Sequence, residues 1–119
     1  MIDLAALDAD LRALALTYPQ AQEDFPWGER VIKVRGKIFV FLSHWKGGFN
    51  VTVKLPHSNE MARLFDCCAP AGYGLGKAGW ITCRLFPDTD FDTALLPGWI
   101  DESYRAVAPR RLVQALSPS

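Results

Sequence analysis

A strict alternation of apolar and polar residues near the middle of the chain constrains its fold most. From position 49 to position 55 every second residue is apolar, in the order F-N-V-T-V-K-L. Successive side chains of a strand point to opposite faces of its sheet. The pattern therefore predicts a strand with one buried face and one face in water.

Three other segments have the composition of strands. Residues 30–35 alternate, Gly36 offers a turn, and residues 37–43 are predicted to return as a second strand. Residues 44–48 contain two glycines and are predicted to form a loop. Residues 80–86 alternate again, which predicts a fourth strand.

Helical patterns flank these strands. Leucines recur at three and four residues from position 4 to position 14, which predicts a first helix that ends before Pro19. A second helix is predicted with Ser58 as its N-cap and an apolar stripe that ends at the break at Pro70; the stripe consists of Met61, Leu64, Phe65 and Cys68. A third is predicted through residues 99–107. The predicted class is α+β, a single-domain antiparallel sheet packed against helices.

Length and composition favour one domain over residues 1–119, because a chain of this size with half of its residues apolar builds one core. The first residues lack the order of a signal peptide, and no apolar run is long enough to span a membrane. We expect a cytoplasmic protein without a membrane partner. The three cysteines do not have zinc or redox spacing and are expected to be buried free thiols.

Charge is unevenly distributed, although the formal net charge is zero. Positions 30–59 carry six basic residues and no acidic one, whereas positions 88–102 carry five acidic residues and no basic one. Basic side chains interleaved with aromatic rings suit phosphate contact and base stacking. The candidate DNA-binding residues are Arg30, Lys33, Arg35, Lys37, Trp45, Lys46, Lys54, Lys77 and Trp80. The alternative is that these charges only keep the strands soluble and block edge pairing.

Residues 74–79 match the string G-x-G-x-x-G, but the context is that of a turn. A dinucleotide site needs a strand before the string and a helix after it. Here a helix is predicted before and a strand after, so the glycines are predicted to allow a tight turn that places Lys77 and Trp80. We expect no cofactor.

Two further motifs are predicted to be structural rather than catalytic. In residues 23–28, E-D-F-P-W-G, the adjacent carboxylates do not converge, and a turn anchored to the core by Phe25 and Trp27 is expected. In residues 101–104, D-E-S-Y, Tyr104 lies on the apolar stripe of its helix, where a packed ring with a hydrogen-bonded hydroxyl is expected. His44 and His57 have no partner at metal-site spacing. We expect no catalytic residue and no metal site.

Together, segments 23–28, 73–81 and 101–104 resemble those of the MmcQ/YjbR family, over roughly positions 18–108. The resemblance implies a small α+β fold like that of the frataxin homologue CyaY, and DNA binding. A frataxin-like topology also raises iron binding. Asp3, Asp8 and Asp10 are too few for an acidic ridge, and the strand that follows is basic.

Two functions follow as hypotheses. The first is a non-enzymatic DNA-binding protein that contacts phosphates weakly and without sequence specificity through a basic sheet face. The second is a protein-interaction or small-ligand module with an apolar groove beside one of the four tryptophans, which are Trp27, Trp45, Trp80 and Trp99.

Overall fold

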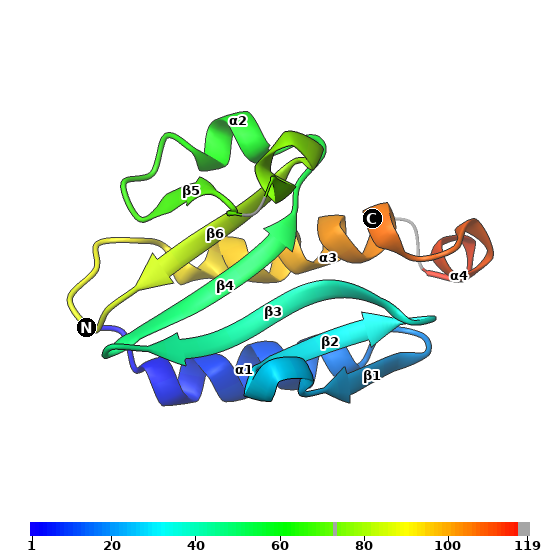
Figure 1. The fold of residues 1–119 in the computed structure, drawn as a ribbon, viewed down its shortest axis with the longest axis horizontal. Coiled ribbons are helices and arrows are strands. Elements are labelled where there is room, and N and C mark those ends of the chain that lie inside the picture. Colours follow the sequence, from blue (N-terminus) through cyan, green and yellow to red (C-terminus); the bar gives the residue numbers. More distant parts are fainter. Residues whose placement is uncertain (73, 117–119) are drawn as a thin grey trace.

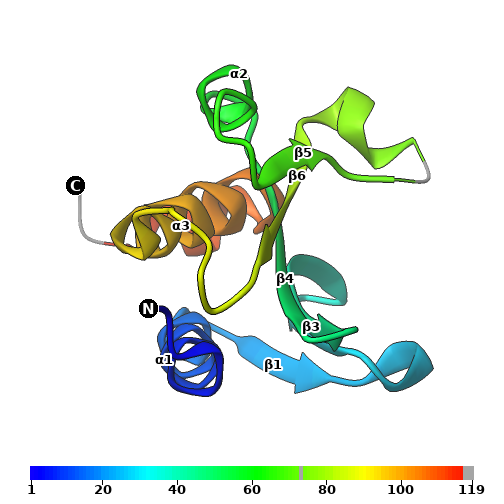
Figure 2. The ribbon, with the colours of Figure 1, turned by 90° about the vertical axis from the view of Figure 1, so that its left-hand side faces the viewer.

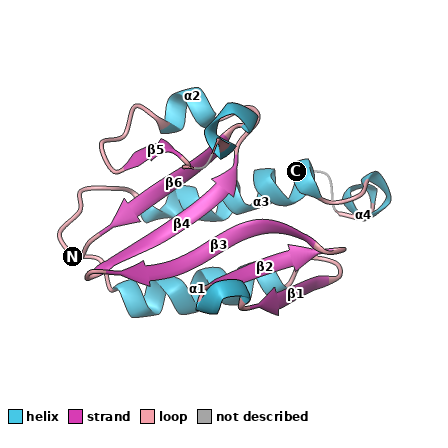
Figure 3. Ribbon diagram, viewed as in Figure 1, coloured by secondary structure: helices cyan, strands magenta, loops and turns pink. Residues whose placement is uncertain are grey.

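The computed structural model describes residues 1–72 and 74–116, with one antiparallel sheet at the centre (Figures 1 and 3). The strands are β1 (Ala21–Asp24), β2 (Arg30–Val34), β3 (Lys37–Trp45), β4 (Gly48–Lys54), β5 (Cys68–Pro70) and β6 (Trp80–Leu85). The helices are α1 (Leu4–Leu16), α2 (Asn59–Ala62), α3 (Leu96–Val107) and α4 (Arg110–Gln114). Short 3-10 turns are η1 (Pro26–Gly28), η2 (Leu75–Ala78) and η3 (Thr93–Leu95). The predicted α+β class is confirmed.

The six strands lie in the order β1-β2-β3-β4-β6-β5. Helices α1 and α3 pack on one face of the sheet, while the turns η1 and η2 project from the other (Figure 2). Among the described residues no helix covers that second face. We call it the open face.

The alternation in β4 sets the two faces. Phe49, Val51 and Val53 are fully buried in the core beneath the helices, and the residues between them are only half-buried. Each apolar residue lies opposite another on β6, so that Val51 pairs with Cys83 and Val53 with Ile81. The predicted strand with one buried and one wet face is confirmed.

The hairpin turns are tighter than the predicted loop at 44–48. β3 continues to Trp45, and β4 begins at Gly48. Lys46 and Gly47 have φ angles of 49° and 80°. Two consecutive left-handed residues close a two-residue hairpin whose twist matches that of the strands, so no longer loop is needed.

The predicted second helix is wrong in length. α2 ends at Ala62, Leu64 is 82% exposed, and Cys68 lies in β5. The chain leaves the helix because Cys68 pairs with Cys83 on β6, a long-range contact that helical periodicity cannot reveal. Strands β1 and β5 and helix α4 were not predicted.

Residues 101–104 on α3 tie that helix to distant segments. The Asp101 carboxylate accepts a hydrogen bond from the Tyr18 hydroxyl at 2.8 Å. Glu102 accepts bonds from the backbone N–H and the hydroxyl of Ser58. The Tyr104 hydroxyl donates to the Pro19 carbonyl at 2.8 Å, and its ring is fully buried. The predicted structural role of Tyr104 is confirmed.

Ser103 fills a gap in the sheet. Between β2 and β3 the register shifts, so that Ile32 pairs with Val40 and Lys33 with Ile38, which leaves Phe39 unpaired. The fully buried Ser103 hydroxyl donates to the Phe39 carbonyl and accepts from the Lys54 N–H at 2.9 Å. Two backbone groups that the ladder leaves free are thereby satisfied.

We predict that Ser103→Ala lowers the free energy of unfolding by about 1–3 kcal/mol, because both backbone groups lose their partner in a buried site. Urea unfolding followed by tryptophan fluorescence measures the change. Ser43→Ala is the control, since its hydroxyl has no hydrogen bond among the described residues and its loss should cost less than about 0.5 kcal/mol. Equal costs for the two variants would contradict the bridging role.

Candidate functional site

The strand register identifies the side chains of the open face. Residues directly opposite each other on neighbouring strands share a face. Thr52 lies between Phe41 on β3 and Thr82 on β6, and Asn50 lies between Ser43 and Arg84. The centre of the open face consists of Phe41, Ser43, Trp45, Asn50, Thr52, Lys54, Trp80, Thr82 and Arg84.

Two hollows that share Thr82 lie on this face. One, of about 210 Å³, runs from Glu29 beside η1 to Leu75 in η2. The other, of about 640 Å³, lies toward β5 and is lined by Cys67 and Arg84 among others. We call the two together the groove. The turn η1 of the first motif (residues 23–28) and the turn η2 of the second (residues 73–81) frame its central part. The third motif (residues 101–104) lies on α3, on the other face of the sheet.

The floor of the groove combines polar groups with aromatic rings. The hydroxyls of Thr52 and Thr82 are 2.8 Å apart. Arg84 donates to the Asn50 side-chain oxygen at 2.9 Å. Phe41 and Trp80 meet edge to face, with ring centroids 5.7 Å apart. Such a surface offers both hydrogen bonds and stacking contacts.

At one end of the open face, Trp45 is 60% exposed and its ring contacts two cations. The Lys46 ammonium is 4.5 Å from its ring centroid and the Arg84 guanidinium 5.3 Å. Arg84 also donates to the Trp45 carbonyl at 2.7 Å. These contacts hold an exposed aromatic ring and two positive charges in one place.

The opposite end of the open face carries Lys54 and Trp80, which are direct partners across β4 and β6. Lys77 is exposed on η2, which immediately precedes Trp80. Gly74 and Gly79 flank η2 with φ angles of 78° and 91°. The predicted tight turn is confirmed for these residues, while Tyr73 of the same motif lies outside the described residues.

Arg35 and Lys37 are exposed at the β2–β3 turn, so the nine candidate residues do not form one basic surface. Arg30 lies on the helix side of the sheet, where its guanidinium is 3.0 Å from Asp8 and 2.9 Å from Glu23. Lys33 is 2.7 Å from Asp24. The expectation that Arg30 shares the basic face is wrong, because Arg30 forms ion pairs with the carboxylates of Asp8 and Glu23 between α1 and the sheet.

The first motif also differs from its prediction. Phe25 and Trp27 are 52% and 86% exposed, so these rings do not anchor the turn to the core. Trp27 adopts a left-handed φ of 57°, which is costly for a bulky residue. As expected, the carboxylates of Glu23 and Asp24 diverge, the first toward Arg12 and the second toward Lys33.

One charged cluster was missed from the sequence. His44 lies in β3, and its Nε2 atom is 2.8 Å from the Asp8 carboxylate of α1. Its ring stacks on Phe49, with centroids 4.7 Å apart. A hollow of about 270 Å³ borders the pair. Because Asp8 and His44 are 36 residues apart in sequence, no local spacing could have revealed them.

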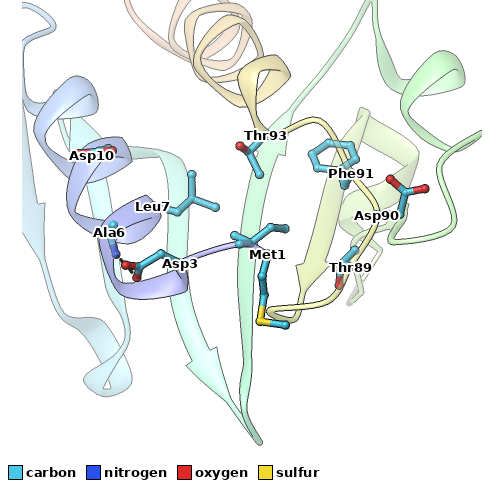
Figure 4. A pocket seen from close by; sticks show the side chains of 10 residues that line it. Met1, Asp3, Ala6, Leu7, Asp10, Thr89, Asp90, Phe91 and Thr93 are labelled. Atoms are coloured by element: carbon cyan, nitrogen blue, oxygen red, sulfur yellow. Dashed lines mark hydrogen bonds between the residues drawn. The ribbon is translucent and has the colours of Figure 1, made fainter.

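A further hollow, of about 430 Å³, lies where the start of α1 meets the chain after β6 (Figure 4). Asp3, Asp10 and Asp90 line it, and Asp3 already accepts a hydrogen bond from the Ala6 N–H at 3.0 Å. This hollow gathers carboxylates, which makes it unsuited to phosphate. Among residues 1–72 and 74–116, no group of three or more His, Cys, Asp or Glu side chains is placed to hold a metal ion. No helix in the same ranges is long and apolar enough to cross a membrane.

Comparison with known proteins agrees with this geometry. A family model, YjbR, matches residues 16–106, a range that contains all three motifs. The chain belongs to the YjbR family. A crystal structure of the Deinococcus radiodurans protein DR2400, with a DUF419 domain, is similar with a TM-score of 0.69 and 26% sequence identity. The match covers 82% of this chain and 75% of DR2400. None of the curated proteins compared with the chain matches it.

In this YjbR protein, the first motif also sets an acid-sensitive contact. The hydrogen bond from Arg12 holds the pKa of Glu23 below its usual value, assisted by the charges of Arg12 and Arg30, although burial opposes the shift. A carboxyl with a lowered pKa in the folded state stabilises the fold above its unfolded pKa, and this contribution is lost as the pH falls through the folded pKa.

We predict that the free energy of unfolding falls less steeply in Glu23→Gln than in the wild type as the pH drops below about 4.5, the ordinary pKa of a glutamate. The difference between the two proteins at neutral pH should stay within about 1 kcal/mol, because the partner Arg12 is well exposed. Thermal unfolding across pH 3–7 measures it. Glu60→Gln is the control, since Glu60 makes no ion pair among the described residues. A variant with an unchanged acid profile would contradict this role for Glu23.

Proposed function

We propose that this YjbR protein is a non-enzymatic nucleic-acid-binding module that uses the open face of its sheet. The observation that carries the proposal is the pair of aromatic sites on that face. The Trp45 ring contacts Lys46 and Arg84, and Trp80 is the cross-strand partner of Lys54. Aromatic rings next to cations are the combination that binds single-stranded nucleic acid without strong sequence preference.

The shape of the groove favours a single strand over a duplex. The turns η1 and η2 project from the open face and frame its central hollow. Along β4 the two aromatic sites are separated by roughly 20 Å, the length of six residues of extended chain. An extended strand lying along β4 would reach the cations of both sites with its phosphates while its bases stack on the rings.

The charge of the face limits the affinity. Glu29 lines the central hollow, and Asp66 and Asp90 line the hollow toward β5. With few free cations and a net charge of zero, the protein has no long-range field to attract a polyanion. We therefore expect weak binding that falls as salt rises, with a Kd around 10⁻⁴–10⁻⁶ M.

The cytoplasmic location expected from the sequence belongs to the same proposal. The three cysteines are free thiols, two of them buried. Unpaired cysteines suit a reducing compartment.

The first test is fluorescence anisotropy of labelled single-stranded and duplex DNA across a salt series. We expect Lys54→Glu with Lys77→Glu to weaken single-strand binding at least tenfold, because Lys54 is the cross-strand partner of Trp80 and Lys77 is exposed on the turn that precedes it. Arg110→Glu with Arg111→Glu on α4 is the matched control, since it changes net charge equally on a different element. An equal loss of affinity in both double variants would show that binding depends on net charge alone, and would contradict a site on the open face.

The second test isolates stacking. We predict that Trp45→Ala raises the single-strand Kd roughly 5- to 150-fold, the usual effect of removing one base-stacking ring. The Trp45→Phe variant should retain most of the affinity, and its salt dependence should match that of the wild type. An unchanged Kd in Trp45→Ala would remove this ring from the site.

Protein binding through the first motif is the second candidate. Phe25 and Trp27 are close in sequence and exposed, and Trp27 holds a strained backbone conformation. Strained residues persist where the surrounding structure enforces them and are frequent at functional sites. Absence of nucleic-acid binding even at low salt would leave this candidate in first place.

A further inference from the structure

The three cysteines of the chain meet at the start of β5, where the adjacent Cys67 and Cys68 lie beside Cys83 of β6. Cys68 and Cys83 are 5% and 0% exposed, and they are direct partners in the strand register. Their sulfur atoms are 2.6 Å apart, and the Cys67 sulfur is 3.8 Å from that of Cys68. All three are free thiols.

The backbone between the strands has the geometry that a disulfide requires. The Arg84 N–H donates to the Cys67 carbonyl at 2.9 Å, so these two residues form a hydrogen-bonded pair. The next pair along an antiparallel ladder is not hydrogen-bonded and brings its Cα atoms to about 4.5 Å. That pair is Cys68 with Cys83, and the spacing lies within the range of disulfides. The pairing of Cys68 with Cys83 is therefore suited to a disulfide.

Only one of the three thiols is open to a reagent. Cys67 is half-buried and lines the 640 Å³ hollow of the groove, beside Arg84. Cys68 and Cys83 face the core. Burial raises the pKa of the Cys67 thiol to about 12, and the contact with Cys83 together with burial raises the pKa of Cys68. Little thiolate is present at neutral pH, so reaction with an oxidant is slow and needs sustained exposure.

We propose that Cys67, Cys68 and Cys83 form a redox relay that stores oxidation as a reversible Cys68–Cys83 disulfide. A hydroperoxide oxidises the Cys67 thiol to a sulfenic acid and is itself reduced to the alcohol, or to water in the case of hydrogen peroxide. The Cys68 sulfur then attacks the Cys67 sulfur and expels water, which forms a Cys67–Cys68 disulfide. Finally the Cys83 sulfur attacks Cys68 and releases Cys67 as a thiol. Two thiols have then lost two electrons to one hydroperoxide.

The relay changes a specific part of the fold. β5 has three residues, lies at the edge of the sheet, and pairs only with β6 among the described strands. A Cys68–Cys83 bond would join β5 covalently to β6. It would also close the intervening chain into a loop that contains η2, the turn that frames the groove. This inference concerns the thiols alone and does not rest on nucleic-acid binding.

The test uses the full chain exposed to hydrogen peroxide. We expect two of the three thiols to be lost per chain, a Cys68–Cys83 cross-linked peptide by mass spectrometry, and full recovery with dithiothreitol. The closed loop should raise Tm by roughly 10 °C. Cys67→Ser should slow the loss of thiols at least tenfold, and Cys83→Ala should stop the reaction at the Cys67–Cys68 stage.

Peptide mapping of the wild-type chain decides the matter even if a variant fails to fold. Three thiols that stay reduced under conditions that oxidise the denatured chain would overturn the relay. So would a final product in which Cys67 carries the disulfide or a sulfonic acid while Cys83 remains free. An unchanged rate in Cys67→Ser would overturn the role of Cys67 as the point of attack.

Discussion

The buried hydroxyl of Ser103 is the contact on which the arrangement of helices and sheet depends. It satisfies the Phe39 carbonyl and the Lys54 N–H at the place where the ladder leaves both free. On either side of it along α3, Glu102 accepts a hydrogen bond at the start of α2, and Tyr104 donates one to Pro19 in the segment between α1 and β1. Hydrogen bonds from three successive residues thus fix the position of α3 against one face of the sheet.

This division of the sheet explains why the groove lies where it does. The covered face takes the apolar side chains of β4 and β6, and the open face receives the polar ones together with Trp45 and Trp80. The turns η1 and η2 rise on that same side (Figure 2). In this YjbR protein, two of the three motifs therefore frame a surface, and the third holds the scaffold behind it.

Much of the fold could be predicted from local patterns. The alternation in β4 and β6 and the apolar stripe of α1 show which face of each element is buried, because burial on one face imposes a period of two residues in a strand and 3.6 in a helix. The prediction failed where contacts between residues distant in sequence determine the secondary structure or the exposure of a side chain. The stripe at 61–68 has helical spacing, yet Cys68 pairs with Cys83, and the exposed Phe25 and Trp27 carry no local sign of their exposure. Charge order likewise could not show that Arg30 faces Asp8 on α1.

By itself, the sequence determined the α+β class, the wet and buried faces of the central strand, the glycine turn before β6 and the structural role of Tyr104. Each of these follows from residue periodicity or backbone freedom, which act between near neighbours. Only the tertiary structure decided which cations stay available, how the cysteines meet, and that two motifs share one face. Those outcomes depend on contacts between residues far apart in sequence, such as Asp8 with His44, and local spacing carries no information about them.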